Sequence, residues 1–244
     1  MISFNKEQIF IVTGASSGIG EATAILLNKL GATVIGIGRN IERLEGMKAK
    51  CEFPENMFLE PKDLTEDIEG LPKYVKALKE KYGKFAGLAY CAGMGGIQPI
   101  RAVEYEQIQK VFSVNYFAPV FMVKGMLDKR NNIGAGTSIV CVASAGGVKC
   151  DPGMTSYAGS KGALIASMES IAKEVASSKI RVNCVSPTLI NTQMADDIAR
   201  QYAEGKYPMG IGEVDDVANY IVFLLSDKTK WIAAKNYIID CGVF

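Results

Sequence analysis

The sequence contains no histidine among its 244 residues. Histidine is the general base of Ser-His-Asp triads and of many dehydrogenases, and it is a common zinc ligand. Enzyme classes that depend on it are therefore excluded, and no metal site is expected. Proton transfer by this chain must use tyrosine, lysine, aspartate, glutamate, serine or cysteine.

An excess of charge of either sign is also missing. The chain has 27 lysines and arginines against 26 aspartates and glutamates, for a net charge of +1, and neither sign forms a block. This balance argues against nucleic acid or an anionic membrane as the main partner. No apolar run reaches the roughly 18 residues that a membrane span needs, and the first residues lack a signal-peptide pattern. We expect a cytoplasmic protein.

The six cysteines form no Cys-x-x-Cys pair. They stand at positions 51, 91, 141, 150, 184 and 241, several of them inside apolar, strand-like runs. This pattern is typical of reduced thiols in a cytoplasmic protein rather than of a disulfide framework or a zinc site. We expect most of these side chains to be buried.

Strand-like apolar runs alternate with helical patterns along the whole chain. Strands are predicted over residues 8–12, 32–38, 57–60, 85–91, 137–144, 180–185 and 236–240, and helices over 21–30, 65–81, 103–129, 157–176 and 214–225. Such alternation indicates a parallel sheet with helices on both faces. We predict one α/β domain over residues 1–244, a Rossmann-type doubly wound fold with a seven-stranded sheet. A stretch around 191–210 is expected to form a substrate lid.

A glycine-rich segment directly follows the first predicted strand. Thr13-Gly14-Ala15-Ser16-Ser17-Gly18-Ile19-Gly20 joins that strand to the first helical pattern. Glycines at such a junction let the backbone turn tightly and approach a pyrophosphate, which binds to the amides at the helix N-terminus. A simple turn would explain the glycines alone, but the strand before them and the helix after them favour nucleotide binding.

The end of the second predicted strand favours NADP over NAD. The acidic residue that would bind a ribose 2′-hydroxyl, about 20 residues beyond the glycines, is missing. Gly38 ends the strand and Arg39 follows it. Arg39 is expected to pair with a 2′-phosphate through charge-assisted hydrogen bonds; the alternative is a solvated surface arginine. Asp63, after the third strand, is expected either to meet the adenine edge or to cap the next turn.

The candidate catalytic residues lie between positions 115 and 161. Tyr157 and Lys161 are four residues apart and so share one face of a helix. An ammonium beside a phenol lowers the pKa of the phenol, and a tyrosine tuned in this way transfers a proton near neutral pH. Ser144, at the end of the fifth strand, would bond the same substrate oxygen. Asn115 interrupts an apolar helical stretch, where it either caps or kinks the helix or holds a water or backbone group that supports Lys161.

Together these residues resemble the short-chain dehydrogenase/reductase family, in its short single-domain branch and over essentially the full chain. Thr13-Gly14-x-x-x-Gly18-x-Gly20 is similar to the family's cofactor motif, Ala92-Gly93 to the end of its Asn-Ala-Gly motif, and 187–192 to the segment that faces the nicotinamide. Asn115, Ser144, Tyr157 and Lys161 match its catalytic tetrad. The spacing from Ser144 to Tyr157 resembles that of 3-oxoacyl-[acyl-carrier-protein] reductases.

The resemblance implies hydride transfer between a nicotinamide and a carbonyl or alcohol carbon. Tyr157 would be the general acid or base, and Lys161 would lower its pKa and bind the nicotinamide ribose. Ser144 would position the substrate oxygen, and Asn115 would anchor a water that connects Lys161 to solvent. The positions expected to contact the cofactor are Gly14, Ser16, Ser17, Gly18, Ile19, Gly20, Arg39, Asp63, Leu64, Cys91, Ala92, Gly93, Tyr157, Lys161, Pro187, Thr188, Ile190 and Thr192.

The chain departs from the family pattern at four places, all outside the tetrad. Cys91 replaces an asparagine, which removes an amide expected to support the fourth strand. Thr188 replaces a glycine, Ala233-Ala234 replace a Thr-Gly pair, and Cys241 replaces a glycine near the C-terminus. These replacements bear on the tightness of cofactor binding and on the family-typical packing at the C-terminal end.

The sequence leaves the substrate open. A 3-oxoacyl thioester, a ketosugar and a small ketone all fit the resemblance. Family members usually form tetramers through two long helices, here 103–129 and 157–176, so a homotetramer or homodimer is expected. The alternative function is a catalytically silent NADP-binding sensor or scaffold, against which the intact tetrad argues.

Overall fold

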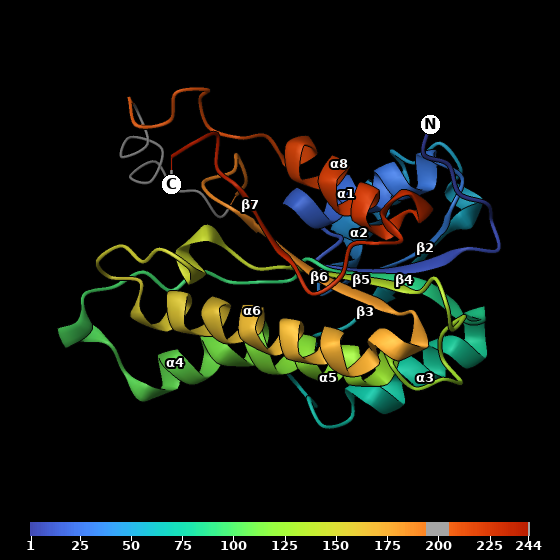
Figure 1. Cartoon of the computed structure of the whole chain (residues 1–244), viewed down its shortest axis with the longest axis horizontal. Coiled ribbons are helices and arrows are strands. Elements are labelled where there is room, and N and C mark those ends of the chain that lie inside the picture. The colour runs from blue at the N-terminus through green and yellow to red at the C-terminus, as the bar shows by residue number, and fades with distance from the viewer. Residues whose placement is uncertain (194–204, 244) are drawn as a thin grey trace.

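Seven strands form one parallel sheet in the computed structural model, which describes residues 1–193 and 205–243 (Figure 1). Their order in the sheet is β3-β2-β1-β4-β5-β6-β7, and every neighbouring pair is parallel. The strands are β1 (Ile9–Thr13), β2 (Thr33–Gly38), β3 (Met57–Pro61), β4 (Phe85–Tyr90), β5 (Ser138–Val142), β6 (Arg181–Pro187) and β7 (Asn236–Ile239). The predicted doubly wound, seven-stranded fold is confirmed.

Helices cover both faces of this sheet. On one face lie α1 (Gly18–Lys29), α2 (Ile41–Lys48) and α8 (Val214–Leu225), and on the other lie α3 (Leu71–Tyr82), α4 (Tyr105–Phe112), α5 (Ala118–Met126) and α6 (Thr155–Val175). The chain runs from β1 outward to β3 at one edge, then returns to the centre at β4 and continues to β7 at the other edge. In open α/β sheets, ligands bind at this reversal, outside the carboxyl ends of the strands.

The strands at the centre of the sheet are buried on both faces. Every residue of β1, β2, β4, β5 and β6 is buried, which explains why β1, β2, β4 and β5 are mostly apolar rather than alternating. β6 instead carries Arg181, Asn183 and Ser186, whose side chains are hydrogen-bonded. Two core clusters result. Leu71, Met122 and Leu164 belong to the cluster on the α3–α6 face, and Leu27 and Leu44 to the one beneath α1, α2 and α8.

Two helices on the N-terminal half differ from the prediction. The sequence prediction did not include α2. Asn40 caps this helix by accepting a hydrogen bond from the backbone N–H of Arg43 at 2.8 Å. α3 begins at Leu71 rather than at residue 65. The side chains of Asp63 and Asp67 accept hydrogen bonds from backbone N–H groups two and three residues ahead, and these turns take the place of the expected first helical turns.

The single helix predicted over 103–129 is divided into three parts. α4 ends at Phe112, a π-helical segment occupies Ser113–Phe117, and α5 begins at Ala118. The predicted interruption at Asn115 is therefore confirmed. Pro119 lies in the first turn of α5 and has no N–H to donate into the preceding π-helical turn; the Val114 carbonyl in that turn accepts a hydrogen bond from the Tyr90 hydroxyl at 3.1 Å.

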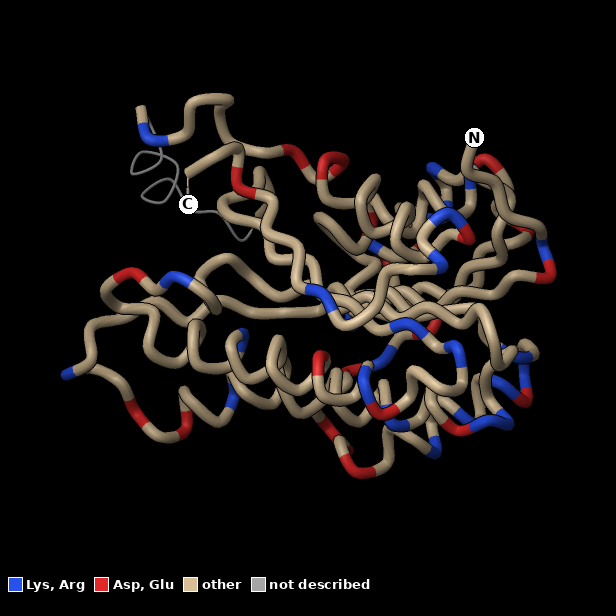
Figure 2. Tube along the Cα trace, in the orientation of Figure 1, with Lys and Arg blue, Asp and Glu red and all other residues tan. Residues whose placement is uncertain are grey.

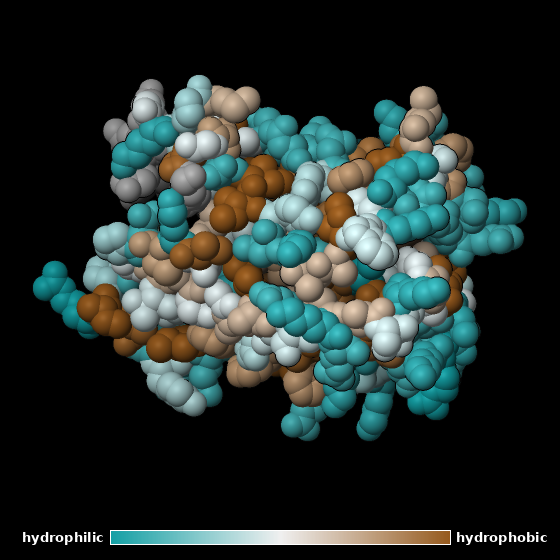
Figure 3. All heavy atoms as spheres, in the orientation of Figure 1, coloured by the Kyte–Doolittle hydropathy of each residue, from teal (hydrophilic) through white to brown (hydrophobic). Residues whose placement is uncertain are grey.

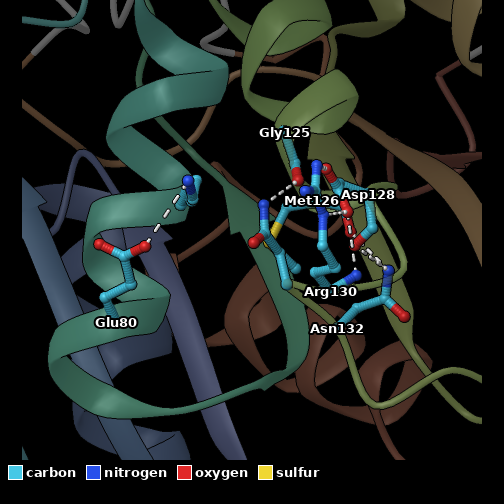
Figure 4. Close-up of polar contacts among 8 residues, drawn as sticks. Glu80, Gly125, Met126, Asp128, Arg130 and Asn132 are labelled. Carbon is cyan, nitrogen blue, oxygen red and sulfur yellow. Dashed lines mark hydrogen bonds and ion pairs between the residues drawn. The ribbon is translucent and has the colours of Figure 1, made fainter.

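The end of α5 is fixed by side chains that follow it in sequence (Figure 4). Asn131 Nδ2 donates to the carbonyl of Gly125 at 2.9 Å, and Asn132 Nδ2 donates to that of Met126 at 2.7 Å. These amides take up carbonyls that the helix leaves without an intrahelical partner. Arg130 pairs with Asp128 at 2.7 Å. The same figure shows Glu80 of α3 in an ion pair within its own helix.

The surface carries both signs of charge, interspersed along the described chain (Figure 2). None of the described helices is both long and apolar enough to cross a membrane. All six cysteines are free; Cys141 and Cys184 are buried, Cys150 is exposed and the other three are partly buried. The expectation that most of the thiols are buried is therefore wrong.

Two of the departures from the family pattern coincide with unusual backbone. Ala234 has φ 57° and Cys241 has φ 48°, both in the left-handed region. A side chain in that region costs roughly 1–2 kcal/mol relative to glycine's freedom there. Glycine is expected at these two positions because their backbone is left-handed, and this chain keeps the same turns with Ala234 and Cys241 instead.

Candidate active site

The glycine-rich loop between β1 and α1 is shaped as a nucleotide cradle. Gly14 has φ +67° and Gly18 has φ +57°, and a Cβ placed on Gly14 would lie only 2.9 Å from the backbone N of Ala92. A Cβ on Gly20 would overlap the Gly14 carbonyl. The N-cap of α1, Ser17, makes no side-chain capping bond. The first amides of this twelve-residue helix can therefore bind a phosphate.

The end of β4 is held against this loop by Thr13 rather than by an asparagine. Thr13 Oγ1 accepts hydrogen bonds from the backbone N–H groups of Cys91 and Ala92 at 3.1 and 3.2 Å. The turn that the missing amide was expected to support is thus fixed from β1. Burial raises the pKa of the Cys91 thiol to about 12, while a hydrogen bond with Thr23 opposes the rise. The thiol is neutral at physiological pH.

Arg39 and Asp63 meet at the ends of β2 and β3. The guanidinium lies 3.9 Å from the carboxylate, and the Arg39 side chain is 80% exposed. Asp63 also accepts hydrogen bonds from the N–H and hydroxyl of Thr65 at 2.9 and 2.7 Å. Burial alone would raise the pKa of Asp63, but the bonds from Thr65 and the positive charges of Arg39 and Lys62 outweigh it and leave the pKa below its usual value. Asp63 therefore caps the turn, and its contact with the adenine edge stays a prediction.

Asn115 is fully buried and ties the π-helical segment to the loop after β4. Its Oδ1 accepts from the Met94 N–H at 2.9 Å, and its Nδ2 donates to the Met94 carbonyl at 3.0 Å and to Ser160 Oγ at 3.1 Å. Of the alternatives open at this position, the structure shows a backbone group held by the amide. A Cβ placed on Gly93 would lie 3.4 Å from both Asn115 Oδ1 and Lys161 Nζ, so the two side chains flank the same glycine.

Ser144, Tyr157 and Lys161 converge where β5 ends and α6 begins. Ser144 follows β5, accepts a hydrogen bond from the Gly146 N–H at 3.1 Å and bonds with the Tyr157 side chain. Lys161 Nζ donates to the carbonyl of Val142 at 2.9 Å. It lies 6.0 Å from the centre of the Tyr157 ring.

The expected effect of Lys161 on the pKa of Tyr157 is not what the structure shows. Burial raises the pKa of Tyr157, and the hydrogen bond with Ser144 opposes this only in part. Burial also lowers the pKa of Lys161 to about 8, against the opposing influence of the nearby thiols. The prediction that the ammonium lowers the tyrosine pKa is therefore wrong for this state. The ammonium is directed to a strand carbonyl, and the phenol is desolvated.

Replacing Lys161 by methionine is expected to raise the free energy of unfolding at pH 7. The folded-state pKa of about 8 lies below the ordinary 10.5, so at pH 7 both states are protonated and the folded state carries the cost of burying the charge. After allowance for the lost bond to Val142, the net gain is about 2 kcal/mol. Between pH 8 and 10.5 the unfolded wild type binds more protons than the folded one, so wild-type stability rises and the gain shrinks.

Urea unfolding at pH 7 and pH 10 measures this difference. Lys173→Met is the matched control, because Lys173 lies on the same helix, is 68% exposed and pairs with Glu169. Its effect should stay within about 0.5 kcal/mol at both pH values. A Lys161→Met protein that is less stable than wild type at pH 7 would contradict a buried, charged lysine.

The other predicted cofactor positions have the following contacts in the structure. Thr192 Cγ2 would be 3.3 Å from a Cβ on Gly18. The Thr188 hydroxyl and N–H both bond the Ile239 carbonyl, and Ile190 bridges to Gly212. Leu64 is part of the core cluster on the α3–α6 face. The predicted lid lies partly outside the described residues, at 194–204.

Three residues near the site were missed by the sequence prediction. Ser160 bonds Asn115 and the Tyr157 carbonyl, and its position within the helical segment between Tyr157 and Lys161 was a usable signal. Val142 contributes only a carbonyl. Arg43 bonds Gln193, a residue of the predicted lid, across 150 residues of sequence, and no local pattern indicates this contact.

Comparisons with known proteins agree with this geometry. A family model described as enoyl-(acyl carrier protein) reductase matches residues 14–244. The 3-oxoacyl-[acyl-carrier-protein] reductase FabG of Thermotoga maritima is 32% identical, with 97% of each chain covered. The NADP-dependent (R)-specific alcohol dehydrogenase of Lentilactobacillus kefiri is 29% identical, with 97% of this chain and 96% of its own covered.

Among solved structures, a short-chain type dehydrogenase/reductase from Mycobacterium ulcerans superposes with a TM-score of 0.88 at 28% identity, covering 99% of this chain and 91% of its own. The likeness thus extends through the sheet, the glycine-rich loop and the C-terminal strand. The chain belongs to the short-chain dehydrogenase/reductase family of oxidoreductases.

Proposed function

We propose that this protein is a cytoplasmic, NADP(H)-dependent oxidoreductase that reduces a carbonyl to an alcohol or catalyses the reverse reaction. The observation that carries the proposal is the meeting of Ser144, Tyr157 and Lys161 beside the glycine-rich loop. The close approach of Gly14 to Ala92, together with the uncapped N-terminus of α1, leaves a backbone cradle that fits a dinucleotide pyrophosphate.

Tyr157 is the general acid of the proposed reduction. Its raised pKa keeps the phenol protonated at neutral pH, which is the form that donates a proton to a carbonyl oxygen. Ser144 bonds the same oxygen and holds it at the phenol. Bound nicotinamide supplies the hydride to the carbonyl carbon.

Lys161 and Asn115 act on the surroundings of the phenol. With a pKa of about 8, Lys161 is mostly charged at pH 7, so its ammonium can donate hydrogen bonds to the ribose of a bound nicotinamide nucleotide. Asn115 fixes the backbone at Met94 through two hydrogen bonds. This keeps Gly93 where the cofactor and Lys161 are expected to meet.

Two observations support NADP over NAD. Arg39 lies at the end of β2 with its side chain largely exposed, and the carboxylate near it is already bonded by Thr65 and paired with the arginine itself. The relative from Lentilactobacillus kefiri is named as NADP-dependent. A 2′-phosphate would replace a weak, solvent-exposed ion pair by charge-assisted hydrogen bonds.

The substrate side of the site has an apolar rim. The loop before α4 exposes Ile97 and Ile100 by 66% and 69%, and Tyr105 begins α4 with 68% of its side chain exposed; Figure 3 shows apolar groups gathered over this part of the molecule. The loop is tied to the segment before α6 by a bond from the Gln98 N–H to the Gly153 carbonyl. A ketone or acyl thioester with an apolar part fits this rim better than a bare ketosugar.

We expect the protein to work as a closed homo-oligomer, a tetramer or a dimer. In the single chain Ala166 of α6 is exposed, and Gly162, Ala163 and Ser167 are partly exposed on the same helix. Such a small-residue face permits close approach of a second helix.

Oxidation of NADPH with a panel of carbonyl compounds tests the proposed function. The panel contains an acetoacetyl thioester, a nucleotide ketosugar, a diketone and a cyclic ketone, and NADH is assayed in parallel. We expect turnover of the thioester or a ketone, with NADPH preferred. Equal use of NADH would remove the role given to Arg39. Binding of NADPH without any turnover would instead favour a catalytically silent sensor.

A further inference from the structure

A second arginine lies next to the glycine-rich loop, on α2. Arg43 is in the first turn of this helix, and its backbone N–H is fixed by the Asn40 cap. Its Nη1 donates to Gln193 Oε1 at 3.1 Å. Gln193 follows a segment that is itself anchored, because the Asn191 N–H bonds the Gly212 carbonyl at 2.8 Å. The contact therefore joins two elements on opposite sides of the loop.

These two residues line a groove of about 950 Å³ that includes the loop itself. Ser16, Ser17 and Gly18 form part of its wall. Ser16, in this wall, packs against the end of β2, since a Cβ placed on Gly38 would lie 3.1 Å from Ser16 Oγ. This is the place where the proposed 2′-phosphate would lie, beside Arg39.

The cations around this part of the groove differ in their partners. Arg39 faces the carboxylate of Asp63 at 3.9 Å, and Lys50 faces that of Glu21 at 2.7 Å. Arg43 instead bonds a neutral amide. Among residues 1–193 and 205–243 no carboxylate forms an ion pair with Arg43, and a guanidinium has five N–H donors, more than one glutamine oxygen can accept.

We propose that Arg43 is a second reader of the cofactor's 2′-phosphate and that Gln193 holds its guanidinium in position for that contact. The inference rests on the proposed NADP(H) dependence. Arg43 would give the phosphate a fork of donors from α2, while Arg39 approaches it from the end of β2. Gln193 is a positioning residue, because it acts through the arginine and touches the phosphate in no step.

Titration calorimetry with NADPH and NADH tests the role of Arg43. Arg43→Gln is expected to weaken NADPH binding about tenfold, the size of one solvent-exposed, charge-assisted contact, and to change NADH binding less than about twofold. Lys50→Gln is the matched control. It removes the same charge from the same groove, but from a side chain already paired with Glu21, and should leave both affinities within about twofold.

A double-mutant cycle tests the role of Gln193. Gln193→Ala should weaken NADPH binding about threefold when Arg43 is present and have no effect in the Arg43→Gln background. Equal losses for NADPH and NADH, or additive effects of the two substitutions, would overturn the positioning role. If wild type prefers NADPH and Arg43→Gln keeps that preference, the inference fails while the proposed function stands. A wild type without the preference removes the basis of both.

Discussion

Replacing Tyr157 by phenylalanine is expected to reduce turnover about 10³-fold or more, with NADPH affinity within about threefold of wild type. General acid catalysis by a positioned side chain contributes typically 10²–10⁴-fold, and no histidine is present to take over the proton. The ring is retained, so its packing and its distance from Lys161 stay the same. Single-turnover measurement of NADPH oxidation, with binding measured separately, gives both quantities.

Tyr220→Phe provides a matched control for this substitution. Tyr220 lies on α8 and packs edge-on against Tyr237 at 5.3 Å between ring centres, so the same hydroxyl is removed far from Ser144. Turnover should then remain within about twofold of wild type. A Tyr157→Phe enzyme with normal turnover would rule out the proposed proton donor. Loss of NADPH binding with Tyr157→Phe would show that the phenol serves the cofactor rather than the substrate.

The second large effect is expected on stability, from Arg181→Met. Arg181 is 6% exposed at the start of β6. Its guanidinium donates to the carbonyls of Leu224 at 2.8 Å and Ser226 at 3.0 Å, at the C-terminal end of α8. There the positive charge also meets the negative end of the helix dipole. The hydroxyls of Ser138 and Thr229 still bond these carbonyls, but two charge-assisted hydrogen bonds are lost, so we expect a loss of about 3 kcal/mol in the free energy of unfolding.

Urea denaturation at pH 7 measures this loss. Arg181→Lys should recover only part of it, because a lysine lacks the planar fork that reaches two carbonyls at once. Arg130→Met removes an arginine whose side chain is 76% exposed and pairs with Asp128, and its effect should stay within about 0.5 kcal/mol. A change of less than about 1 kcal/mol in Arg181→Met would mean that water replaces the guanidinium at the end of α8.

The sheet could be predicted from the sequence because its central strands β1, β4 and β5 are buried on both faces and are therefore mostly apolar runs. Helix limits were less predictable, because they depend on side chains that bond distant or non-helical backbone. α3 starts late since Asp63 and Asp67 favour turns before it. α5 stops at Met126 since Asn131 and Asn132 bond its last carbonyls.

The candidate site shows the same division. The spacing of Tyr157 and Lys161 on one helix predicted that they share a face, and they do. The predicted lowering of the Tyr157 pKa did not follow, because it depends on the direction of the Lys161 ammonium. That ammonium bonds the Val142 backbone carbonyl, a contact that side-chain identities cannot indicate. The roles of these residues in catalysis remain proposals.

The π-helical segment between α4 and α5 has a consequence for insertions and deletions. A π turn corresponds to one extra residue in an otherwise α-helical stretch. Removing one residue within Ser113–Phe117 would restore an ordinary α-helix, with α4 and α5 still able to continue one another. The carboxamide of Asn115 would then no longer face Met94. A one-residue deletion would therefore preserve the helix but disrupt the site beside it.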